Sequence, residues 1–172
     1  MQTPLWVVVP VLVLVAMATQ SDVTSRRIPN RLVGPAILIA LVTHGVMGGW
    51  TGLLGSAAGM LAAAGLLLPG HLARWMGAGD VKLMAAVGAW FAWPQAVVAL
   101  LASLVAAGIL AAVIALRRRI FTRTLHGAAA IGFWALTTPA GSRSSGPAVT
   151  GVRFPFAAAA ALGTIFTLIF PA

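Results

Sequence analysis

Residues 77–84 have the sequence GAGDVKLM, in which a glycine-rich tetrapeptide ends in a carboxylate and an apolar run follows. Asp80 is one of only two acidic residues among 172, and the other, Asp22, follows the first apolar run. The run after Asp80 ends at Trp93, which makes about 13 residues, or roughly 20 Å of helix. Since the hydrocarbon core of a bilayer is about 30 Å thick, this helix is predicted to begin below the membrane surface, with Asp80 at its recessed end.

The composition is that of an integral membrane protein. Apolar residues make up 60% of the chain and charged residues only 8%, whereas soluble domains are nearer half apolar and a quarter charged. The net charge of +9 does not indicate nucleic-acid binding, because the basic residues lie in short gaps between apolar runs, where topology and lipid headgroups account for them. The chain has no cysteine, which excludes thiol catalysis, disulfides and cysteine-ligated zinc.

Apolar runs predict an all-α, polytopic membrane bundle of six transmembrane helices, at residues 4–18, 32–47, 50–68, 81–93, 96–116 and 154–170. A further apolar stretch, 128–136, is too short to span and is expected to be interfacial. The stretch 137–151 is rich in Gly, Ser and Pro, which predicts a loop. We therefore expect a single domain over residues 1–172, with a mobile cytoplasmic loop at about 117–152.

The distribution of charge predicts the orientation of the bundle. Six spans place all 11 Lys and Arg residues on one side, as the positive-inside rule requires. Both termini are then outside, and both acids lie near the cytoplasmic side. A secretory signal is an alternative for residues 4–18, but no Lys or Arg precedes this run, so an uncleaved helix is expected.

Local sequence features predict the turns between helices. The stretch 21–31 is expected to be a polar turn, because the residue before Pro29 avoids the helical region. Two glycines at 48–49 predict a tight turn between the second and third runs.

Other small and aromatic residues predict packing. Gly55 and Gly59 have the spacing of a small-residue contact between helices of the same chain. Trp90 and Trp93 are expected at the membrane interface opposite Asp80.

The two acids are candidates for chemistry as a pair. An ionisable residue at membrane depth is costly and is therefore a functional candidate. Two adjacent carboxylates do not both ionise easily, so Asp22 and Asp80 could share a proton. The ionised group could then take a proton from water while the protonated one polarises a carbonyl. This is the chemistry of aspartic proteolysis, and it needs no metal, cofactor or thiol.

Three neighbours of Asp80 are candidates for substrate binding. Gly77 and Gly79 are expected to allow unusual backbone dihedrals and to leave space for a peptide backbone. Lys82 lies two residues past Asp80 and therefore points to a different helix face. We expect it to extend to the membrane interface, with substrate binding as the alternative.

Simpler roles stay open for both acids. Asp80 could be only a helix cap, and Asp22 only a polar helix end paired with Arg26. Both roles would suit a non-catalytic membrane assembly subunit. A small proton-coupled transporter is a further alternative, although two acids at one face suit a proton relay poorly. The three histidines lack ligand-like spacing and are expected to be packing or interfacial residues: His44, His71 and His126.

These segments resemble those of the type IV prepilin peptidases, the GxGD membrane aspartyl proteases. Residues 77–82 are similar to the family's GxGDxK element. Asp22 with the Ile-Pro-Asn run at 28–30 is similar to the segment that holds the family's first catalytic aspartate. The Phe-Pro-Phe run at 154–156 is similar to the entry of its last helix.

The resemblance implies that Asp22 and Asp80 are catalytic, with no cofactor, metal or nucleic acid. The implied substrate is a prepilin or pseudopilin, bound through its leader peptide and the start of its hydrophobic helix, and cut at the cytoplasmic face of the bacterial inner membrane. Membrane lipids are the other expected partner, and no oligomeric state is implied. Because the paired cysteine motifs of the bifunctional members are missing, the chain is more similar to the short peptidases of tight-adherence (Flp-type) pilus systems. No N-methyltransferase activity is expected.

Overall fold

The structure, a computed structural model, describes residues 3–25, 27–73, 76–117, 126 and 156–170. Within these ranges, helices are the regular secondary structure, joined by short connections. The helices are α1 (Leu5–Ser25), α2 (Asn30–Leu72), α3 (Ala78–Phe91), α4 (Gln95–Arg117) and α6 (Phe156–Ile169). Three of them, α1, α2 and α4, are long and apolar enough to cross a membrane. The all-α membrane fold is thus confirmed, whereas six spans and outward termini stay predictions.

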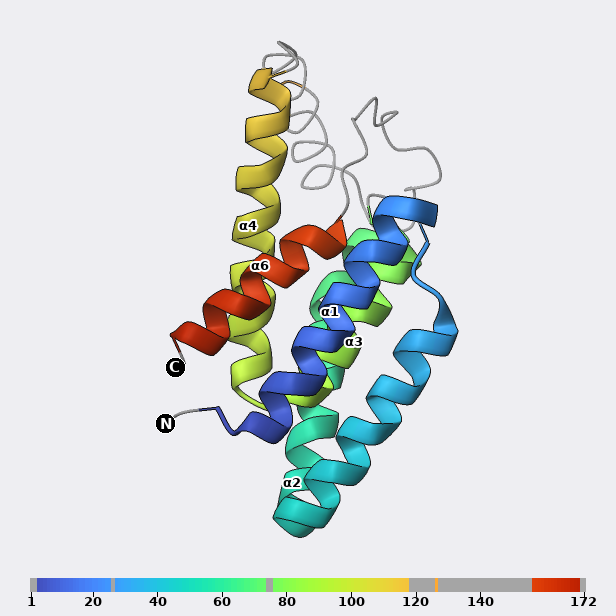
Figure 1. Cartoon of the computed structure of the whole chain (residues 1–172), viewed down its shortest axis with the longest axis vertical. Helices are drawn as coiled ribbons and strands as arrows, with labels where there is room; N and C mark the ends of the chain where they lie inside the picture. Colours follow the sequence, from blue (N-terminus) through green and yellow to red (C-terminus); the bar gives the residue numbers. More distant parts are fainter. Residues whose placement is uncertain (1–2, 26, 74–75, 118–125, 127–155, 171–172) are drawn as a thin grey trace.

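Helix α2 contains the turn expected at residues 48–49. Gly49 has φ 60° and ψ −148°, which interrupts the helical backbone and is a conformation that suits glycine. Figure 1 shows α2 running to one end of the molecule, reversing there and returning. A Cβ atom added at Gly45 would lie 3.8 Å from Cβ of Leu53, so the two halves pack closely next to the turn.

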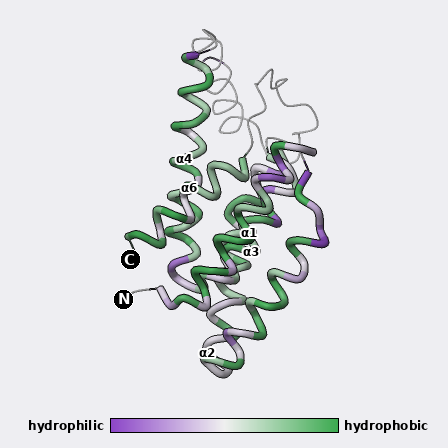
Figure 2. The backbone as a smooth tube through the Cα atoms, in the orientation of Figure 1, coloured by the Kyte–Doolittle hydropathy of each residue, from purple (hydrophilic) through white to green (hydrophobic). Residues whose placement is uncertain are grey.

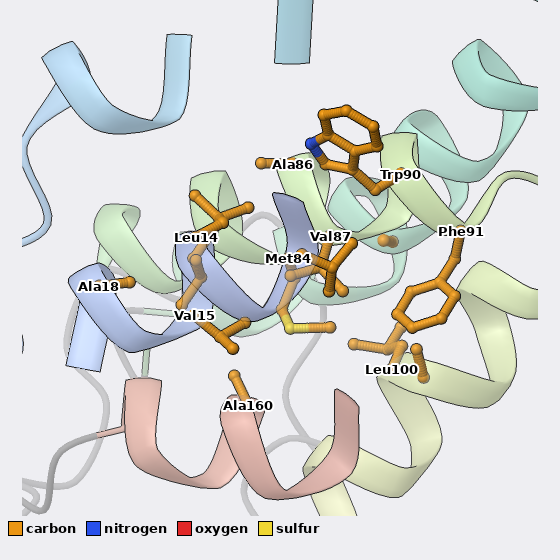
Figure 3. Close-up of a cluster of buried hydrophobic side chains, with 14 of the residues drawn as sticks. Leu14, Val15, Ala18, Met84, Ala86, Val87, Trp90, Phe91, Leu100 and Ala160 are labelled. Carbon is orange, nitrogen blue, oxygen red and sulfur yellow. The ribbon is translucent and has the colours of Figure 1, made fainter. Parts of the chain in front are cut away.

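Helix α3 is the centre of the bundle. Every residue from Leu83 to Phe91 is buried, so this helix is enclosed on all sides and has no polar face. Figure 3 shows Met84 of α3 lying among Val15 of α1, Leu100 of α4 and Ala160 of α6. The same hydrophobic cluster extends to Val33 and Leu67 of α2.

Glycine allows α2 and α3 to cross with their backbones in contact. A Cβ atom at Gly59 would collide with the carbonyl oxygen of Gly88 and come within 2.8 Å of the carbonyl carbon of Ala92. A Cβ atom at Gly88 would lie 2.8 Å from Cβ of Ala63. Gly55 accepts a hydrogen bond of 2.9 Å at its carbonyl from the backbone N–H of Trp93. The predicted packing role of Gly55 and Gly59 is therefore confirmed.

Helix α1 is longer than the apolar pattern indicates. The stretch 21–31 was expected to be a turn, but α1 continues to Ser25. The polar side chains of this added turn bond within the helix: Thr24 donates to the carbonyl of Gln20 at 2.8 Å, and Ser25 to that of Ser21 at 2.8 Å. Because these hydroxyls have partners in α1 itself, the polar composition does not require a turn here. Asp22 consequently lies in the last turns of α1.

Trp90 is buried inside the bundle and does not present its ring to lipid, as an interfacial anchor would. Its side chain is 3% exposed, whereas that of Trp93 is 59% exposed. The reason is the enclosure of α3: His44 of α2 contacts Trp90 edge-on with ring centroids 6.4 Å apart, and Trp6 of α1 contacts His44 at 5.0 Å. His44 is buried and bonds through Nδ1 to the carbonyl of Ala40 at 2.9 Å, which agrees with its expected packing role.

Four sequence predictions fall outside the described residues. They are the pairing of Asp22 with Arg26, the interfacial stretch 128–136, the loop 137–151 and, but for Arg117 and His126, the mobile segment 117–152. The single domain over 1–172 also stays a prediction.

The crossing of α2 and α3 yields a test of the fold. Gly59→Ala would force the two backbones apart, and such overpacking costs about 1–3 kcal/mol. We expect a lower midpoint of thermal unfolding in detergent. The matched control is Gly65→Ala, in the same half of α2, where an added Cβ would meet nothing within 4 Å and should raise helix stability by about 0.5–1 kcal/mol. Equal midpoints for the two variants would contradict the close crossing.

Candidate active site

The two acidic residues lie at the same end of the bundle. Asp22 is near the carboxyl end of α1, and Asp80 is in the first turn of α3. Figure 1 shows the end of α1 and the start of α6 meeting at this end, and Figure 2 shows hydrophilic residues concentrated there. The carboxyl groups are near enough for the charge of Asp22 to act on the ionisation of Asp80. The structure therefore brings together the two residues that the sequence singled out.

Asp22 accepts a hydrogen bond from the start of α6. The backbone N–H of Ala157 donates to Oδ2 of Asp22 at 3.3 Å. One turn earlier on α1, the hydroxyl of Thr19 donates to the carbonyl of Ala157 at 3.1 Å. The first N–H groups of a helix have no partner within it and carry partial positive charge, so this contact suits an ionised carboxylate.

Asp80 accepts a hydrogen bond from the start of its own helix. The backbone N–H of Gly77, the residue before α3, donates to Oδ2 of Asp80 at 3.3 Å. Asp80 therefore does cap α3, as the sequence allowed. It does so from the third position of the helix, whereas the N-cap position is occupied by Gly77. Such a bond holds the carboxyl group against the helix start and leaves Oδ1 available for other contacts.

Burial raises the pKa of Asp80 from 3.8 to about 6, the negative charge of Asp22 adds to this rise, and the hydrogen bond from Gly77 opposes it. Asp80 precedes the apolar part of α3 and lies outside the three candidate membrane spans. Desolvation and a neighbouring like charge both disfavour the ionised form. Asp80 therefore holds its proton to a higher pH than an ordinary aspartic acid does.

Gly77 and Gly79 do not have the unusual backbone dihedrals that were expected. Gly77 is extended, with φ −70° and ψ 146°, and Gly79 is part of α3, so any residue could adopt either conformation. A Cβ atom added at either glycine would contact another residue of this site. A Cβ at Gly77 would lie 3.3 Å from Oδ2 of Asp80, and one at Gly79 would lie 3.4 Å from Cβ of Ile28. Their contacts are therefore with other parts of this site.

Lys82 contacts Asn30, which was not among the predicted site residues. Its Nζ donates to Oδ1 of Asn30, the first residue of α2, at 3.0 Å. The side chain is exposed and extends from α3 toward the start of α2. Its expected extension to the membrane interface stays a prediction. Asn30 belongs to the Ile-Pro-Asn run, which was the signal that pointed to it.

No sequence motif indicated that Thr19 and the start of α6 lie beside Asp22. Nothing in the spacing of residues indicates that the backbone of Ala157 faces Asp22, because the two are 135 positions apart. His71, by contrast, makes a local contact between Nδ1 and the carbonyl of Met76 at 3.1 Å. It braces the connection before Gly77 and agrees with a packing role.

The fold and the two interacting carboxyl groups define a helical membrane protein with the side chains that an aspartic peptidase uses. The chain belongs to the type IV leader peptidase family, since the family model of that description matches residues 7–112. The matched range includes both acids and the residues from Gly77 to Lys82. The chain is therefore a type IV leader peptidase-like protease of the aspartic class, with a prepilin as substrate. Comparison with curated proteins gives no match, and neither does comparison with solved structures.

The raised pKa predicts how stability depends on pH. Folding raises the proton affinity of Asp80, so the wild type loses stability as pH rises from about 4 through about 6. Asp80→Asn mimics the protonated side chain at every pH. We expect its unfolding midpoint in detergent to exceed that of the wild type above pH 6, and the difference to shrink to a constant below pH 4.

Gly65→Ala provides the control, because a neutral change in open space should shift the midpoint equally at each pH. Midpoints are compared at one scan rate, since unfolding of membrane proteins is often irreversible. A pH-independent difference for Asp80→Asn would contradict burial of the carboxyl group.

Proposed function

We propose that this chain removes the leader peptide of Flp-type prepilins or pseudopilins by a two-aspartate mechanism. Asp22 and Asp80 are the proposed catalytic residues. The observation that carries the proposal is their interaction at one end of the bundle, where burial and the charge of Asp22 raise the pKa of Asp80. The family match favours this function over a transporter or an assembly subunit.

The environments of the two acids suggest separate roles. Asp22, held by the N–H of Ala157 at the start of α6, acts as the ionised base that takes a proton from the attacking water. Asp80 gives its proton to the oxygen of the scissile carbonyl as the water oxygen bonds to carbon. Collapse of the resulting diol breaks the C–N bond, with the proton on Asp22 passing to the leaving amine and a proton from one diol hydroxyl passing to Asp80. The cycle consumes one water and leaves the pair as it began, with Asp22 ionised and Asp80 protonated.

The exposed apolar side chains support a position across the bacterial inner membrane. Large apolar residues are exposed along α1, α2 and α4, including Val13, Ile39, Leu61 and Val105, and lipid tails would cover them. The described basic residues lie next to helix ends: Arg27 and Arg31 where α1 connects to α2, Lys82 near the start of α3, and Arg117 at the end of α4. Cleavage is therefore proposed at the cytoplasmic face.

The mechanism predicts that either acid is indispensable. Asp22→Asn and Asp80→Asn should each abolish leader removal from a coexpressed Flp-type prepilin, scored as a mobility shift, because neither variant can complete the proton transfers. The loss expected for catalytic groups is at least about 10²-fold. Gln20→Asn is the control: it is a polar change on an exposed residue of α1, and it should leave cleavage intact.

Each variant is also checked for wild-type abundance in the membrane fraction. Cleavage by either Asp variant at the wild-type rate would refute the proposed mechanism. Mass analysis of the mature pilin tests the absence of methyl transfer, for which an unmethylated amino terminus is expected.

A further inference from the structure

The segment 27–30, which connects α1 to α2, touches both helices that carry the acids. It leaves α1 a few residues after Asp22 and enters α2 at Asn30. On the α1 side, the hydroxyl of Ser21, the residue next to Asp22, donates to the carbonyl of Arg27 at 2.8 Å. The hydroxyl of Ser25 donates to the same carbonyl at 3.3 Å. The start of the segment is thus tied to the turn of α1 that holds Asp22.

The other end of this segment is tied to the start of α3. The side chain of Ile28 lies over Gly79, the residue next to Asp80, where an added Cβ would be 3.4 Å from Cβ of Ile28. Two residues further along, Oδ1 of Asn30 accepts the hydrogen bond of 3.0 Å from Lys82. Ile28 lies before Pro29, which has φ −71°, and proline restricts both residues. A short, stiff segment therefore connects the neighbours of one acid to the neighbours of the other.

We propose that the hydrogen bond between Lys82 and Asn30 is a positioning contact, which sets the separation of the two carboxyl groups. Lys82 lies about 200° around α3 from Asp80, given 3.6 residues per turn, so it does not point at the reacting atoms. It acts through the backbone, by holding the end of segment 27–30 against the first turn of α3. This inference rests on the proposed roles of Asp22 and Asp80.

The test compares leader cleavage by purified protein in detergent across matched variants. Lys82→Met removes the donor and Asn30→Leu removes the acceptor, each with little change in size. Displacing catalytic groups by about 1 Å can cost about 10²-fold in rate. We expect kcat to fall by about ten-fold or more in each variant, with KM changed by less than about two-fold. The double variant should be no worse than either single one, since both remove the same contact.

Lys82→Arg is the rescue variant, because it keeps a donor at the same position and should retain most of the wild-type kcat. The alternative role of Lys82, substrate binding, gives a different pattern. A rise in KM with kcat unchanged, or additive losses in the double variant, would overturn the positioning role. Wild-type kinetics in both single variants would also overturn it.

A second measurement separates this inference from the catalytic proposal. The chain has no cysteine, so a double substitution of Asp22→Cys and Asp80→Cys creates the only two thiols for cross-linking. We expect Lys82→Met in this background to lower the yield with a short bifunctional reagent, and Lys82→Arg to preserve it. An unchanged cross-linking yield would refute the positioning role of this contact and would not bear on the catalytic roles of Asp22 and Asp80. Cleavage by Asp22→Asn refutes the catalytic roles, whatever the yield.

Discussion

The enclosure of α3 is the constraint on which the other parts of the structure depend. A helix buried on every side from Leu83 to Phe91 needs neighbours in all directions, and α1, α2 and α4 supply them with contact from α6. The glycine crossing at Gly59 and Gly88 brings α2 within backbone contact. Such a tightly enclosed helix has little freedom to slide or rotate. Its first turn, which carries Asp80, is therefore held at a defined place at the end of the bundle.

Helix starts provide the polar partners of both acids. Asp80 is bonded to the N–H that precedes α3, and Asp22 to an N–H of α6. The first N–H groups of a helix have no partner within it, so they can satisfy carboxylates placed beside them without a basic side chain. This arrangement leaves the like charges to influence each other, which raises the pKa of Asp80. Direct pairing of Asp80 with Arg or Lys would have the opposite effect.

The arrangement of helices could be predicted from the sequence because the hydrophobicity of successive residues adds up along each apolar run. Apolar runs separated by basic gaps indicated helices and their ends, and the spacing of Gly55 and Gly59 indicated a close helix contact. The predictions that failed were those based on local residue type, at places where other contacts determined the structure. A polar composition suggested a turn, but α1 continues to Ser25, with the hydroxyls of Thr24 and Ser25 bonded to carbonyls of the same helix. Trp90 was assigned to an interface on residue type alone, while the central position of its helix buries it.

The sequence by itself determined that this is a helical membrane protein, that its two acids lie at one end, and that Gly77 to Lys82 adjoin the site. Tertiary structure decided which backbone groups and side chains meet them: Ala157 with Asp22, Ile28 with Gly79, and Asn30 with Lys82. The physical reason is the difference between the two kinds of interaction. Burial of apolar surface is non-directional and can be summed along a chain. Hydrogen bonds and close contacts require particular distances and angles, and these are set only when helices far apart in sequence have packed.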